Sequence, residues 1–172
     1  AKVLFAAGYT WPGLTIAEDS IALDILASHP AVDPDRLGCC GLSLGGLRTN
    51  YLSALSKRIS VSVVAGFMTT WRDMVSRIAF NHTWMAYIPR IAQKLDFPDI
   101  TAIHADNPLM VLSCSMDPLF TYDEVKIATN KLQKIYEKAG ASDKLRTLEF
   151  DVKHQFNKEM QKEAFSWFDR WL

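Results

Sequence analysis

The stretch CCGLSLGGL, Cys39 to Leu47, places a serine between glycines at the second position on either side, inside an otherwise apolar run. A small apolar segment too short for a helix precedes the serine, and a helix-forming segment follows the glycines. Glycines let a strand turn sharply into a helix, and a serine in such a turn is strained and exposed. This feature therefore requires a buried strand joined directly to a helix.

The rest of the chain alternates between strand and helix patterns. Apolar and β-branched runs predict strands at 37–43, 59–68, 107–115 and 144–152. Capped or amphipathic runs predict helices at 15–30, 46–56, 121–140 and 157–172. Because helical crossovers join parallel strands, this order predicts an α/β fold with a mostly parallel sheet flanked by helices, in a single domain that spans 1–172.

Two of these helices carry the spacing of a capping box, in which a threonine at the N-cap pairs with an acidic residue three positions later. Thr15 and Glu18 have this spacing at the first helix. Thr121 and Glu124 have it at the third helix, which Gly140 would end. We therefore expect these two helices to begin at the two threonines.

Residues 69–106 are less regular, rich in Trp, Met and His, and too long for an ordinary connection. We expect them to form short helical elements in a cap-like insertion. Trp71, Trp84 and Tyr87 are candidate substrate-binding residues, because aromatic side chains in a cap would offer an apolar wall. The alternative is that these side chains only fill the core under a long loop.

Composition argues against several classes of function. Nineteen basic and nineteen acidic residues give a formal net charge of zero, which favours neither nucleic acid nor a membrane surface as a partner. We interpret the three cysteines as small core residues, and the four histidines lack the spacing of metal ligands. The GLSLGG stretch lacks the lysine of a phosphate-binding loop. We expect no metal, no cofactor, a small-molecule substrate and, by default, a cytoplasmic location.

Ser43 alone is a poor nucleophile, so it needs a base within hydrogen-bond reach and an acid that orients the base. In a parallel sheet, these partners belong on loops at the carboxyl ends of later strands, in the chain order serine, acid, histidine. Asp117 follows the predicted strand 107–115, and His154 follows the predicted strand 144–152. The sequence therefore predicts a catalytic triad of Ser43, Asp117 and His154, with the backbone N–H of Leu44 as an oxyanion donor.

The competing histidines and acid are less well placed. His29 ends a helix, His82 lies inside the expected cap, and His104 precedes a strand instead of following it. Asp106 likewise lies at the amino end of its strand, on the wrong side of the sheet for this site.

Several stretches together resemble a known family. They are VDPDRLGCCGLSLGGLRTNYLSAL, FMTTW, HTWMAYIPRI, LDFPDI, PLMVLSCSMDPLF and KHQFNKEMQKEAFSWFDRWL. From Thr15 to the end, the chain resembles the carboxyl-terminal part of α/β-hydrolases of the dienelactone hydrolase and acetyl-xylan-esterase-like group. The resemblance implies Ser43 as nucleophile, Asp117 as acid, His154 as base and ester hydrolysis as the usual chemistry. Dienelactone hydrolases proper have a cysteine at the position of Ser43, so the esterase branch is the closer match.

We therefore expect a serine carboxylesterase that cleaves small carboxylic esters through an acyl-enzyme. The same triad could instead act on thioesters or peptides, because leaving-group preference depends on the shape of the pocket. In a different class, the chain would be a catalytically weak or inactive remnant that serves as a binding or structural module. Such a remnant would keep the motif because the turn needs its glycines.

The resemblance also implies a larger sheet. The family has eight strands with the nucleophile after the fifth, whereas only residues 1–42 precede Ser43, and 2–9 leave room for at most one short strand. We therefore expect a truncated α/β-hydrolase fold without the second oxyanion donor, and with strand 37–42 at an edge. Unpaired backbone groups on such an edge need a cover. We expect a homo-oligomer to supply it, with the amino-terminal segment or a separate chain as alternatives.

Overall fold

Four parallel strands, in the order β1-β2-β3-β4, form the sheet of the computed structural model, which describes residues 2–172. The strands are β1 (Leu37–Leu42), β2 (Ile59–Ala65), β3 (Leu109–Cys114) and β4 (Leu145–Phe150). Each neighbouring pair is parallel, with Cys40 opposite Val63 and Val64 opposite Val111. The predicted parallel sheet is therefore confirmed, although β2 ends at Ala65 and is shorter than the predicted run.

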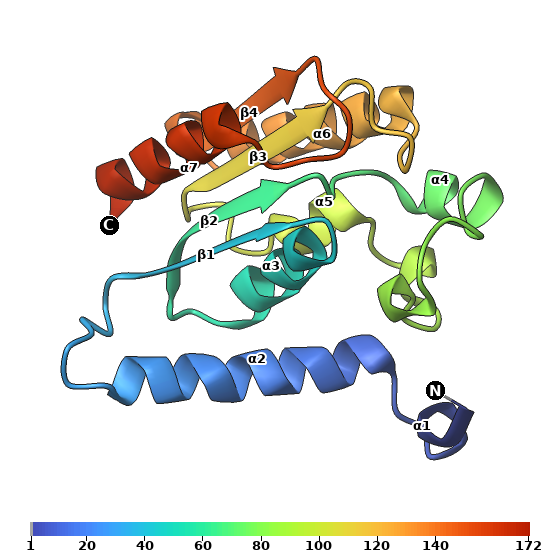
Figure 1. The fold of residues 1–172 in the computed structure, drawn as a ribbon, viewed down its shortest axis with the longest axis horizontal. Coiled ribbons are helices and arrows are strands. Elements are labelled where there is room, and N and C mark those ends of the chain that lie inside the picture. The colour runs from blue at the N-terminus through green and yellow to red at the C-terminus, as the bar shows by residue number, and fades with distance from the viewer. Residues whose placement is uncertain (1) are drawn as a thin grey trace.

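Helices cover both faces of this sheet (Figure 1). The long helices are α2 (Trp11–Ser28), α3 (Leu44–Leu55), α6 (Tyr122–Lys138) and α7 (Lys158–Trp171). Helices α3 and α6 pack on one face and α7 packs on the other, while α2 lies outside α3.

The two central strands are buried on both faces, which explains their nearly continuous apolar sequence. Val63 and Leu112 face α7, where Met160 packs against them. Val64 and Val111 point to the opposite face and join the core under α3 and α6. Side chains of one strand therefore alternate between two hydrophobic clusters, one on each side of the sheet.

Short helical elements make up the cap-like insertion between β2 and β3. They are α4 (Trp71–Ser76), the one-turn 3₁₀ helices η1 (Trp84–Ala86) and η2 (Ile91–Gln93), and α5 (Phe97–Thr101). The expected cap at 69–106 is thus present at the carboxyl end of β2 (Figure 1). Across residues 2–172, no helix has both the length and the apolar composition that a membrane span requires.

The first long helix begins earlier than the capping pattern predicts. Thr10 is its N-cap, with a hydroxyl that accepts a backbone N–H of the first turn, and Pro12 occupies an early position that tolerates proline. The Thr15 hydroxyl donates instead to the carbonyl oxygens of Trp11 and Pro12. The predicted capping box of Thr15 and Glu18 is therefore wrong, because Thr15 already lies inside the helix.

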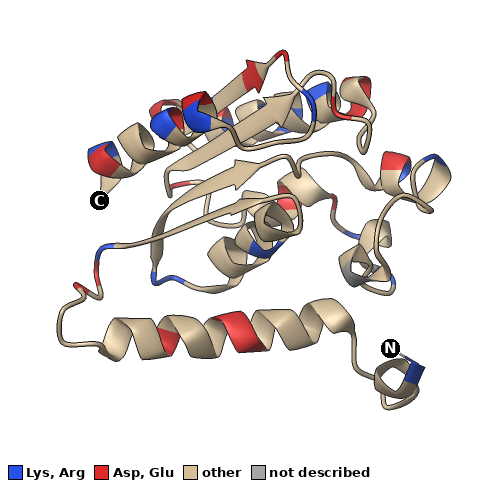
Figure 2. Cartoon of the chain, in the orientation of Figure 1, with Lys and Arg blue, Asp and Glu red and all other residues tan. Residues whose placement is uncertain are grey.

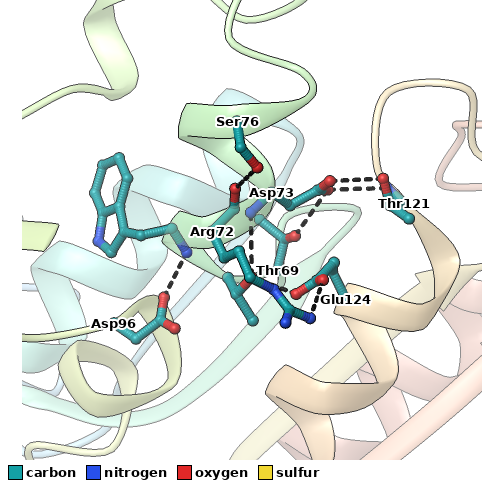
Figure 3. A network of polar contacts seen from close by, with 9 residues as sticks. Thr69, Arg72, Asp73, Ser76, Asp96, Thr121 and Glu124 are labelled. Carbon is teal, nitrogen blue, oxygen red and sulfur yellow. Dashed lines mark hydrogen bonds and ion pairs between the residues drawn. The ribbon is translucent and has the colours of Figure 1, made fainter.

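The second predicted capping box marks the correct start of α6 but has different contacts (Figure 3). Thr121 donates its backbone N–H (3.1 Å) and its hydroxyl (2.6 Å) to the carboxylate of Asp73 on α4. Glu124 accepts a hydrogen bond from the Thr70 hydroxyl at 2.6 Å and pairs with Arg72. Asp73 in the first turn of α4 therefore binds Thr121, the N-cap of α6, and Glu124 in the first turn of α6 binds Thr70, the N-cap of α4.

The amino-terminal segment forms a helix, α1 (Lys2–Ala6), and not a strand. The Phe5 ring packs edge-to-face on Trp84 of the cap, with 5.9 Å between ring centroids, so α1 lies beside the cap and not along β1 (Figure 1). The proposed cover by this segment is therefore wrong. Strand β1 lies at an edge of the sheet as expected, and α2 nearby exposes Ile21 and Ile25.

The glycines around Ser43 differ in how much space they have. A Cβ on Gly41 would lie 2.2 Å from the backbone of Gly45, and one on Gly46 would lie 2.8 Å from the Ala65 oxygen. A Cβ on Gly45 would have nothing within 4 Å. We expect Gly41→Ala and Gly46→Ala each to lower the free energy of unfolding by about 1–3 kcal/mol or more in denaturant titrations. Gly45→Ala should be neutral or slightly stabilising, and a loss equal to that of Gly41→Ala would contradict this interpretation.

The Glu124 carboxylate makes the stability of the fold depend on pH. Burial raises its pKa, but hydrogen bonds from Thr70 and Arg72 outweigh burial and hold the pKa below its ordinary value of 4.5. The charged form therefore stabilises the fold above pH 4.5, and this contribution is lost as the pH falls through the lowered pKa. At pH 7, Glu124→Gln should lower the free energy of unfolding by about 1.5–3 kcal/mol.

As the pH falls from 4.5 through the lowered pKa of Glu124, the difference between wild type and Glu124→Gln should shrink, because the carboxylate becomes protonated and both side chains are then uncharged. Urea unfolding at several pH values measures this difference. Glu137→Gln, an exposed glutamate on the same helix, is the matched control and should change stability much less. A difference between wild type and Glu124→Gln that does not vary with pH would exclude the proposed role of the charge.

Candidate active site

Ser43 occupies the turn between β1 and α3 in a backbone conformation that serine rarely adopts. Its φ is 58° and its ψ is −120°. A non-glycine residue in such a conformation stores strain of about 1–3 kcal/mol, and strain of this kind concentrates at functional sites. Ser43 is also the N-cap of α3, yet its side chain makes no capping hydrogen bond. The hydroxyl is therefore free to act outside the helix.

Backbone hydrogen bonds extend the parallel ladder beyond the ends of the strands. The N–H of Ser43 donates to the Ala65 carbonyl, the N–H of Gly66 donates to Leu112, and the N–H of Ser115 donates to Phe150, each at 2.9 Å. The loops that follow β1, β2 and β3 therefore leave the sheet side by side, at the carboxyl-terminal ends of the strands.

Asp117 and His154 lie on two of these loops and contact each other. The Nδ1 atom of His154 lies 2.6 Å from Oδ2 of Asp117, and the other carboxylate oxygen of Asp117 accepts the N–H of Leu119 at 2.9 Å. An ionised carboxylate only accepts, so the imidazole proton belongs on Nδ1. In its neutral form, His154 then has an unprotonated Nε2, which is the nitrogen that a general base requires.

The imidazole of His154 lies over Gly66, next to the turn that holds Ser43. A Cβ on Gly66 would lie 3.1 Å from Cε1 of His154 and 3.1 Å from Cδ1 of Leu42. Within residues 2–172, no hydrogen bond joins Ser43 to His154. Catalytic hydrogen bonds are often long before substrate binds, so this geometry is compatible with a base that engages Ser43 in the complex.

Leu44, the expected oxyanion donor, is the first residue of α3. The first four N–H groups of an α-helix have no intrahelical acceptor, and the helix dipole places partial positive charge there. The N–H of Leu44 therefore has the position that the sequence predicts, directly after Ser43.

The three aromatic residues expected to bind substrate have other contacts. Trp71 is 5% exposed and stacks on Phe97 with 4.3 Å between ring centroids. Tyr87 donates its hydroxyl to the Met74 carbonyl at 2.8 Å. Trp84 packs edge-on against Trp11 of α2. Trp71 and Tyr87 thus belong with the core, and these contacts favour the core-filling alternative for them.

Phe120, which the sequence analysis did not assign to the site, lies near His154, and His82, which it placed in the cap, packs on Phe120. The Phe120 ring stands between two imidazoles, 4.8 Å from the ring of His82 and 6.4 Å from that of His154. The apolar residues directly after Asp117 were the available signal for Phe120. No spacing pattern indicates that His82, thirty-five or more residues earlier in the chain, packs on it.

The described part of the chain, 2–172, contains no group of three His, Cys, Asp or Glu side chains that could hold a metal ion. The cysteines are all free thiols. Cys114 is buried, and burial raises its pKa, which keeps it protonated and unreactive at neutral pH. Cys40 is exposed on the edge strand, so its prediction as a core residue is wrong.

The model of the prolyl oligopeptidase family matches residues 6–172. The Bacillus subtilis (strain 168) protein YtaP, which is named as a hydrolase, is 27% identical over 172 residues. That match covers 99% of this chain and 58% of YtaP, so the chain spans well under two thirds of the length of this relative.

Solved structures share the fold. Methylesterase BT1017 has a TM-score of 0.73 at 21% identity, over 94% of this chain and 36% of that one. A structure described as an acetyl xylan esterase from Bacteroides fragilis NCTC 9343 has a TM-score of 0.74 at 18% identity, over 87% of this chain and 39% of that one. One described as a dienelactone hydrolase from Klebsiella pneumoniae has a TM-score of 0.60 at 16% identity, over 91% and 60% of the two chains. The α/β-hydrolase fold that the sequence motifs predict is therefore confirmed.

The space above Gly66 determines where the His154 ring can lie. Gly66 and Gly140 both have positive φ values, 58° and 69°, so an alanine at either position should cost about 1–2 kcal/mol of backbone strain. Only at Gly66 would the new methyl group also contact the imidazole, because a Cβ on Gly140 has nothing within 4 Å. We expect Gly66→Ala to shift the NMR resonance of the His154 Cε1–H group. Gly140→Ala should leave it unchanged, and equal shifts in the two variants would contradict the contact.

Proposed function

The chain belongs to the prolyl oligopeptidase family, and we propose that it is a serine hydrolase that cleaves small carboxylic esters. One observation carries the proposal. The strained turn that presents Ser43 lies beside a hydrogen-bonded pair of Asp117 and His154, at the carboxyl ends of strands β1, β3 and β4 of one parallel sheet. These residue types in this order are those of a nucleophile, an acid and a base.

In the proposed mechanism, Nε2 of His154 takes the proton of the Ser43 hydroxyl as its oxygen attacks the ester carbonyl carbon. The resulting imidazolium is stabilised by the Asp117 carboxylate and returns the proton to the departing alcohol. A water molecule then attacks the acyl-enzyme after giving its proton to Nε2, and the carboxylic acid and free Ser43 are released. Each proton that leaves a nucleophile is thus returned to a leaving group.

The backbone N–H of Leu44 would stabilise the oxyanion formed at each attack. It is the one donor that we assign within residues 2–172, and loss of a single donor typically lowers the rate by about 10²- to 10³-fold. Esters have better leaving groups than peptides and need less stabilisation, which favours esters as substrates of this site.

Charge also supports a neutral substrate. Residues of both signs alternate along α6 and α7, whereas the loops directly after β1 and β2 carry no charged residue (Figure 2). The names of the methylesterase and the acetyl xylan esterase with the same fold support ester chemistry as well. Thioesters and peptides are the competing substrates of the same triad.

Hydrolysis of p-nitrophenyl acetate by the 172-residue chain tests the proposal. Ser43→Ala should lower kcat/KM by about 10³-fold or more, because the proposed mechanism forms the acyl-enzyme on the Ser43 hydroxyl. Ser142→Ala, an exposed serine far along the chain, is the matched control and should keep full activity. A fluorophosphonate should label the wild type and the control but not Ser43→Ala.

Three outcomes would redirect the assignment. Activity that survives in Ser43→Ala would identify a different nucleophile. A folded wild type that neither turns over the ester nor reacts with the fluorophosphonate would favour the non-catalytic module. Faster cleavage of a thioester or of a peptide p-nitroanilide than of the ester would show that thioesters or peptides, and not carboxylic esters, are the preferred substrates.

The solution mass of the same sample tests the expected homo-oligomer, in which a second copy covers the edge of β1.

A further inference from the structure

His82 connects the cap to the loop that carries Asp117. It lies in the segment between α4 and η1, and its Nε2 atom is 2.7 Å from the carbonyl oxygen of Leu119. A carbonyl oxygen only accepts, so the Nε2 atom must carry a proton and donate it. The protonation of this nitrogen is therefore determined by its partner.

Three hydrogen bonds then run in series toward the proposed base. His82 binds the carbonyl of Leu119, the N–H of Leu119 donates to Oδ1 of Asp117 at 2.9 Å, and Oδ2 of Asp117 lies 2.6 Å from Nδ1 of His154. The two backbone groups of Leu119 are both used, one toward the cap and one toward the acid. A shift of Leu119 would therefore change the direction of the Asp117 carboxylate.

Packing holds the His82 ring in place. It lies 4.8 Å from the ring of Phe120 and 6.1 Å from the ring of Phe67, and both of these phenylalanines are buried. The donor is thus fixed by aromatic contacts, which a flexible surface side chain would lack.

The far end of the same loop is also attached to the cap. Thr121 donates two hydrogen bonds to Asp73 of α4 (Figure 3). The segment from Asp117 to Thr121 is therefore held by the cap at two points, through Leu119 and through Thr121. Of the two, the bond from His82 is the one adjacent to the carboxylate.

We propose that His82 is a positioning residue, which acts through Leu119 to keep the Asp117 carboxylate directed at His154. The expected effect of His82 on the rate rests on the proposed function, but its effect on the hydrogen bond between Asp117 and His154 can be measured without turnover. His82 takes no proton from substrate and does not replace His154 as base. Its role makes the geometry of the triad depend on the cap.

Two substitutions separate the donor from the ring. His82→Phe keeps an aromatic ring against Phe120 but removes the donor. His82→Gln removes the ring but places an amide N–H at nearly the reach of Nε2. If the donor matters, His82→Phe should lower kcat for p-nitrophenyl acetate by about 10- to 100-fold, with KM nearly unchanged. His82→Gln should restore most of kcat.

A proton NMR signal gives a readout that does not need activity. A short hydrogen bond between a carboxylate and an imidazole gives a far-downfield resonance, here assigned by its absence in Asp117→Ala. This resonance should be lost or shifted upfield in His82→Phe and kept in His82→Gln. His29→Phe, at the exposed end of α2, is the control and should leave both the resonance and kcat unchanged.

The unfolding midpoint is measured for each variant, and His82→Leu replaces His82→Phe as the donor-less variant if the latter does not fold. An unchanged resonance and unchanged kcat in the donor-less variant would overturn the proposal. Equal losses in His82→Gln and His82→Phe would also overturn it, because an N–H donor supplied at this position would then not preserve the direction of the Asp117 carboxylate. If wild type is inactive but the resonance responds as expected, the proposed function fails while the positioning role of His82 stands.

Discussion

The backbone hydrogen bonds that continue the parallel ladder past the strands are the interaction on which the site depends. Through them, the turn of Ser43 is attached to β2, the turn of Gly66 to β3, and the start of the Asp117 loop to β4. Each site loop therefore takes its position from a neighbouring strand that is buried on both faces or backed by a helix. A site built on such elements is held more accurately than one built on free loops. The histidine over Gly66 then completes a group of side chains from three separate strand ends.

Much of this arrangement could be predicted from sequence because it depends on local patterns. The apolar runs specify which segments are strands, and their alternation with helices specifies parallel pairing. Once the strands are parallel, residues that follow them meet at one edge, which is why Asp117 and His154 could be chosen before their contact was seen. The close packing of Gly41 and Gly46 follows from the same motif.

The features that could not be predicted from the sequence depend on competition between hydrogen-bond partners, some of which are distant in the chain. Thr15 has the spacing of an N-cap, but Thr10 and the proline after it start the helix first. Thr121 and Glu124 have the same spacing, yet their side chains find partners on α4 that lie 48 to 54 positions away. Local spacing identifies groups that can form a bond, and the fold decides which bond forms. The same limit applies to His82, whose contact with the acid loop no periodicity indicates.

The exchange of capping acids between α4 and α6 has a consequence for how the protein folds. Helix α4 has six residues, and isolated helices shorter than about 12 residues are marginal in water. Its N-cap is completed by Glu124, which reaches it only after the chain has passed through the cap and β3. We therefore expect α4 to form late, when α6 has docked on the sheet, with the entropy of closing that long loop lost at this step. By the same reasoning, we expect local opening of the cap in the native state to release the acid loop while the sheet stays folded.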